Sequence, residues 1–116
     1  MAQIPDRPKT TTHKATEYTT INPLLEAMYK EFQELSRKKP DGQVGPTKVK
    51  MVNRLLKAIH LVLEGEPNRG YLDELNEDDL PQNSDVVLIL SQTDAAMNAF
   101  RAKYCGWDGS QTTWFT

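Results

Sequence analysis

The stretch VKMVNRLLKAIHLVL, residues 49–63, decides the fold of this chain. Its aliphatic side chains recur at spacings of three and four residues, at Val49, Val52, Leu56, Ile59 and Leu63. This period places them on one stripe of an α-helix. The stretch therefore predicts an amphipathic helix, which we expect to begin near Pro46 and to end before Gly65.

An earlier part of the chain repeats this period. The apolar positions are Ile21, Leu24, Leu25, Met28, Phe32 and Leu35. Asn22 is a good N-cap and Pro23 suits the first helical position, so we expect this helix to begin there. Pro40 predicts its end, and the short turn over residues 40–46 favours an antiparallel helical hairpin.

A third stripe runs from Val86 to Tyr104 and predicts a helix that begins at residues 83–84 and ends before Gly106. The patterns together predict an all-α fold, a small bundle of three long amphipathic helices with a short helical turn near residues 70–76. The apolar stripes exceed what three helices of this size can bury, which favours self-association.

The chain divides by composition into three parts. Residues 1–19 hold almost no large aliphatic side chains, so we expect a flexible polar arm. Residues 20–105 form the helical bundle domain. Residues 106–116 combine aromatic side chains with small polar ones, and we expect an aromatic C-terminal tail.

Composition excludes several classes of function. The chain of 116 residues has a net charge of −2, one cysteine and two histidines. This inventory gives no internal disulfide, no cysteine-based metal site and no hydrolase triad, so we expect neither metal nor cofactor. The longest aliphatic run, Val86 to Leu90, is far shorter than the roughly 20 residues that span a bilayer. We therefore expect a cytoplasmic protein without membrane association.

A basic face accompanies the apolar stripe of the second helix. Lys50, Arg54 and Lys57 recur at helical spacing, which could bring them together on a phosphate-bearing ligand. Exposed helix faces are also rich in Lys and Arg simply because these side chains stay solvated. The face therefore supports nucleic-acid or nucleotide binding as an alternative function.

Arg54 and His60 form the only catalytic pattern that we retain. An arginine can stabilise a phosphoryl transition state and a histidine can transfer a proton. The seven residues from Arg54 to His60 resemble the Arg-x(4–6)-His motif of HEPN-type ribonucleases, which are helical and form their site across a dimer. The position after the arginine is often polar in that family and is Leu55 here, and an offset of six residues separates the two side chains by about 240° around a helix.

Three aromatic side chains lie outside the predicted helices. Trp107, Trp114 and Phe115 stand among Gly, Ser, Gln and Thr residues. Large aromatics in such a segment are typical of anchors that dock into a groove of a partner. The alternative is that they cap the end of the bundle, and the sequence favours neither.

These observations favour a non-enzymatic helical module that acts in interaction or regulation by binding a partner protein, and that forms a homo-oligomer. Compact chains without motifs are common among phage and mobile-element accessory proteins, so this is one expected origin. Nucleic-acid or nucleotide binding is the alternative, and a HEPN-like ribonuclease is the second alternative.

Overall fold

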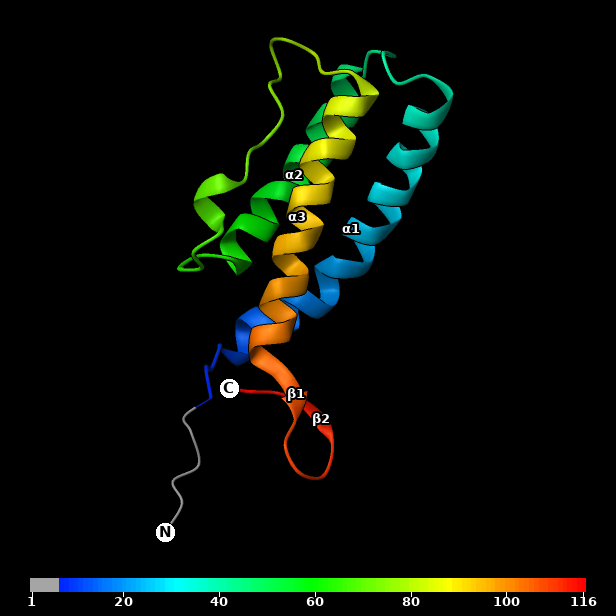
Figure 1. The fold of residues 1–116 in the computed structure, drawn as a ribbon. Coiled ribbons are helices and arrows are strands. Elements are labelled where there is room, and N and C mark those ends of the chain that lie inside the picture. Colours follow the sequence, from blue (N-terminus) through cyan, green and yellow to red (C-terminus); the bar gives the residue numbers. More distant parts are fainter. Residues whose placement is uncertain (1–6) are drawn as a thin grey trace.

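A computed structural model describes residues 7–116 and confirms the predicted all-α bundle. Its three long helices are α1 (Thr12–Lys38), α2 (Pro46–Val62) and α3 (Asn83–Tyr104). The expected helical turn near residues 70–76 is present, slightly earlier, as the short 3₁₀ helix η1 (Arg69–Tyr71). Helix α2 returns antiparallel to α1, and the connection over residues 63–82 leads back so that α3 runs in the direction of α2 (Figure 1).

Helix α1 begins much earlier than the sequence predicts. Thr11 is the N-cap, and its side chain accepts a hydrogen bond from the backbone N–H of Lys14 at 3.1 Å. The predicted start at Asn22-Pro23 is therefore wrong, and Pro23 lies inside the helix. The additional turns are stabilised by packing, because Ala15 and Tyr18 are buried although this segment lacks large aliphatics. The expected boundary between arm and bundle at residue 19 thus falls inside α1, while residues 1–6 of the arm lie outside the described residues.

The core lies between the three helices and follows their predicted stripes. Its largest fully buried side chains include Leu25 of α1, Leu56 of α2, and Leu90 and Phe100 of α3. At one end of the bundle the loop between α1 and α2 is tied to the start of α3. The backbone N–H of Val44 donates to the carbonyl of Pro81 at 2.8 Å, and that of Asn83 donates to Gly42 at 2.8 Å. These bonds fix the helices at that end.

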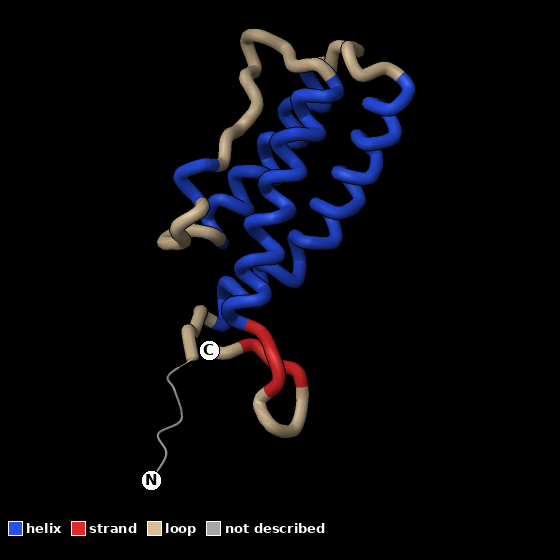
Figure 2. The backbone as a smooth tube through the Cα atoms, viewed as in Figure 1, coloured by secondary structure: helices blue, strands red, loops and turns tan. Residues whose placement is uncertain are grey.

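The C-terminal tail folds into a β-hairpin at the other end of the bundle (Figure 2). Strand β1 (Cys105–Trp107) pairs antiparallel with β2 (Thr112–Trp114), with Cys105 opposite Trp114. The turn is closed by Asp108, whose carboxylate accepts from the backbone N–H groups of Ser110 and Gln111. The sequence analysis did not predict these strands.

Candidate functional site: an apolar groove between helices α1 and α2

An apolar groove of ≈530 Å³ runs between α1 and α2 on the surface of the bundle. Its floor is formed by buried side chains, Ile21 and Phe32 from α1 and Val52 from α2. The remaining lining residues are Leu24, Ala27, Met28, Glu31, Lys48, Met51, Arg54, Leu55 and Ala58. No residue of α3 lines the groove, so the third helix leaves this face of the helix pair uncovered.

Two large apolar side chains of the groove stand in solvent. Leu24 on α1 is 58% exposed and Met51 on α2 is 47% exposed. The sequence analysis placed Leu24 in the core stripe of the first helix, and the structure corrects that assignment. Met51 carried no signal of its own, although the excess of apolar stripe over what three helices can bury pointed to a face of this kind.

The two walls of the groove carry opposite charges. Glu31 lines it from α1, whereas Lys48 and Arg54 line it from α2. All three side chains are exposed, and none forms an ion pair with another part of the described chain, residues 7–116. The groove therefore presents an apolar floor between an acidic and a basic edge.

The three cations that the sequence placed on one basic face all lie on helix α2, but they have different neighbours. Arg54 lines the groove. Lys57 borders the flank of α2 that faces away from the groove, with its Nζ 3.8 Å from a carboxylate oxygen of Glu74. Lys50 is exposed and does not line the groove. A phosphate-bearing ligand bound by all three would have to compete with the Glu74 carboxylate for Lys57.

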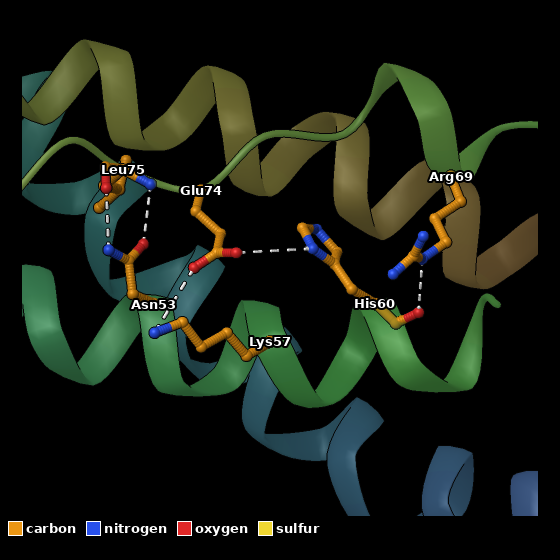
Figure 3. A network of polar contacts seen from close by, with 6 residues as sticks. All are labelled: Asn53, Lys57, His60, Arg69, Glu74 and Leu75. Carbon is orange, nitrogen blue, oxygen red and sulfur yellow. Dashed lines mark hydrogen bonds and ion pairs between the residues drawn. The ribbon is translucent and has the colours of Figure 1, made fainter.

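That opposite flank of α2 is covered by the connection over residues 63–82 (Figure 3). Asn53 is buried, and its side-chain amide makes two hydrogen bonds with the backbone of Leu75. Its Nδ2 donates to the carbonyl at 2.9 Å, and its Oδ1 accepts from the N–H at 2.7 Å. Further along, the Nε of Arg69 donates to the backbone carbonyl of His60 at 2.9 Å. Apolar contacts accompany these polar ones, because Leu75 is buried in the core and Leu72 and Leu80 pack against it.

His60 belongs to this covered flank. Its side chain is 14% exposed, and its Nδ1 lies 4.0 Å from a carboxylate oxygen of Glu74. Its Nε2 is buried and has no hydrogen-bond partner within the described part of the chain. Burial disfavours the charged imidazole and lowers the pKa of His60 below 6.5, an effect that exceeds the opposing influence of Glu74.

Arg54 and His60 therefore face different neighbours, the groove and the connection over residues 63–82. The structure does not bring together, within one chain, the two side chains that resemble a HEPN-type motif.

The three aromatic residues of the tail have different environments. Trp114 is half-buried, and its ring centroid lies 5.1 Å from that of Tyr18 and 5.9 Å from that of Phe100. Phe115 is half-buried beneath the guanidinium of Arg7, at 4.8 Å from the ring centroid. Trp107 is 62% exposed. Trp114 and Phe115 thus close the end of the bundle, and Trp107 is the one whose indole faces solvent.

Residues 7–116 hold no group of three His, Cys, Asp or Glu side chains placed to share a metal ion. They also include no helix with the length and apolar character needed to cross a membrane. Comparison with models of known protein families gives no match, and comparisons with curated proteins and with solved structures give none either.

Proposed function

We propose that this chain is a non-enzymatic interaction module that binds a partner protein through the groove between α1 and α2. The observation that carries the proposal is the exposure of Leu24 and Met51 on opposite walls of a groove whose floor is apolar. Exposed apolar surface of this kind marks interaction sites, because covering it removes the unfavourable contact with water.

The partner segment that fits this groove is an amphipathic α-helix. Helices bind in grooves between helices through apolar side chains that recur at three and four residues. Ala27 and Ala58 leave room for such a helix to approach closely, and Met28 and Met51 have flexible side chains that adapt to its surface. The groove thus recognises an apolar stripe.

The charged edges of the groove favour one orientation of a bound helix. A helix that carries a cation on the side of Glu31 and a carboxylate on the side of Lys48 and Arg54 is favoured over the reversed one. Such edge charges contribute mainly to specificity and to the rate of association, while the apolar floor supplies affinity.

Nucleic-acid binding through Lys50, Arg54 and Lys57 is the weaker alternative. Only Arg54 lies at the groove, and Lys57 lies beside the carboxylate of Glu74. For the location of the protein we propose the cytoplasm, which the single free thiol of Cys105 supports.

A selection from a library of displayed helical peptides tests the proposal. We expect enrichment of peptides with apolar residues at i, i+3 or i+4, and i+7. We expect their affinity to fall about tenfold or more when Leu24→Glu or Met51→Glu is introduced, because a charge is forced into the contact.

Leu88→Glu is the matched control, because Leu88 is 60% exposed but lies on α3, away from the groove. Peptides that bind all three variants as well as the unmodified protein would place the interaction elsewhere. A selection without an apolar helical pattern would remove the proposal.

A further inference from the structure

We infer that the groove between α1 and α2 is occupied by the same groove of a second copy of this chain, in a dimer whose two-fold axis runs parallel to these helices. This inference rests on the proposed function, since it names the partner of the same site. It is carried by the positions of the three charged residues along the groove.

The three charged side chains lie at similar heights along the helices, measured from the end of the bundle where α1 ends and α2 begins. Helices α1 and α2 are joined by a short loop, so the end of α1 and the start of α2 lie at the same end of the bundle (Figure 1). Glu31 is seven residues from the end of α1, while Lys48 and Arg54 are two and eight residues from the start of α2. At about 1.5 Å per residue, Glu31 is about 10 Å from that end, between Lys48 at about 3 Å and Arg54 at about 12 Å.

A two-fold axis parallel to the helices keeps every residue at its height and exchanges the two walls. Helix α1 of each copy then lies beside α2 of the other, antiparallel to it, so that the helix dipoles oppose each other favourably. Glu31 of each copy lies level with the space between Lys48 and Arg54 of the other copy. The groove is therefore complementary to itself, as a two-fold interface requires.

The other two-fold arrangement, with the axis across the groove, gives the opposite result. It places α1 against α1 and α2 against α2 and reverses the heights, so that Glu31 gains no cation from the facing wall, while Lys48 and Arg54 meet the wall that carries the same two cations. Like charges at an interface disfavour association. The positions of Glu31, Lys48 and Arg54 thus favour one of the two arrangements.

The apolar residues of the two grooves form the centre of a four-helix arrangement. Leu24, Met28, Met51 and Leu55 of each copy point toward the axis from the walls of the groove. A face as long as the 17 residues of α2 and two helices wide is about 25 Å by about 20 Å. Counted on both copies this is about 1,000 Å², which is the lower bound for a specific interface.

Sedimentation equilibrium of the full chain and its charge variants tests the inference. We expect the unmodified protein to be a dimer. Glu31→Lys should raise the dissociation constant about tenfold or more, because two symmetry-related attractions become repulsions. Lys48→Glu with Arg54→Glu should weaken the dimer in the same way.

Two combinations distinguish this dimer from a general effect of charge. An equimolar mixture of the Glu31→Lys chain and the Lys48→Glu, Arg54→Glu chain should form a heterodimer. The triple variant that carries all three reversals should recover the homodimer. Glu26→Lys is the control, because Glu26 is exposed on α1 and does not line the groove.

All of these positions are exposed, and helical circular dichroism reports whether each variant remains folded. The inference would be overturned if the unmodified protein is a monomer, or if Glu31→Lys leaves the dissociation constant of the dimer unchanged. The peptide selection is independent of this result. If the protein is monomeric and binds helical peptides in the groove, the proposed function stands and only the identity of the partner is wrong.

Discussion

The two flanks of α2 differ in whether the chain itself covers them. One flank is covered by the chain itself, because the connection over residues 63–82 is held to the helix by Asn53, Glu74 and Arg69 (Figure 3). The other flank forms a wall of the groove and is left open. On the covered flank Asn53 and Lys57 contact other parts of the chain, whereas the charged groups of the open flank have no ion-pair partner in residues 7–116.

This difference indicates where a partner is to be expected. Apolar side chains are found on both flanks, so their presence alone does not distinguish a core from an interface. The distinguishing feature is whether neighbouring charges and backbone groups are already satisfied.

Replacement of adjacent leucines on α1 separates core from groove most strongly. Leu25 is fully buried and Leu24 is 58% exposed. Leu25→Ala should lower the free energy of unfolding by about 2–5 kcal/mol, because it leaves a cavity. Leu24→Ala should change it by less than about 0.5 kcal/mol. Urea denaturation at a protein concentration that keeps the chain monomeric measures both, and equal losses would mean that Leu24 belongs to the core.

Asn53→Ala removes the attachment on the covered flank. The variant leaves the backbone N–H and carbonyl of Leu75 without their partners, and Leu75 is buried. We expect a loss of about 2–3 kcal/mol in the free energy of unfolding. Asn98→Ala, at an exposed position of α3, is the control and should cost less than about 0.5 kcal/mol. A small effect of Asn53→Ala would show that water replaces the amide.

His60 makes the covered flank sensitive to pH to a smaller extent. Burial lowers its pKa in the folded chain below 6.5, so the unfolded chain binds the proton more readily. Between the folded and unfolded pKa values the unfolded state thus holds more protons, and stability falls as the pH falls through this range.

We therefore expect His60→Gln to remove that part of the loss of stability below pH 6.5. The measurement is chemical denaturation at several pH values, with and without the substitution, in a His13→Gln background that leaves His60 as the only histidine. An unchanged pH dependence would mean that the imidazole is not held away from water.

The sequence alone predicted the helices whose buried side chains recur with the helical period. The stripe over residues 49–63 recurs as the buried side of α2, and the stripe from Val86 to Tyr104 as that of α3. The sequence did not predict the start of α1, because Asn22-Pro23 has the local chemistry of a helix start. The turns before it depend on Tyr18, which stacks on Phe100 and contacts Trp114 edge-to-face. These partners are more than 80 residues away in the chain.

The candidate site was predicted only in general terms. An excess of apolar stripe suggested that the chain binds something, and Arg54 was among the residues singled out. Leu24 and Met51 could not be distinguished from core residues, because exposure depends on which face of the helix pair α3 covers. The carboxylate of Glu74 beside Lys57 could not be predicted either, since the position of Glu74 depends on the path of residues 63–82.

The class of fold, the three amphipathic helices and their approximate extents follow from local patterns, because helical period and terminating residues act along the chain. Which apolar residues remain exposed, the closing of the bundle by the aromatic hairpin, and the opposite charges on the two walls of the groove follow from how the helices pack. These features depend on contacts between residues distant in the sequence, and no local pattern encodes them.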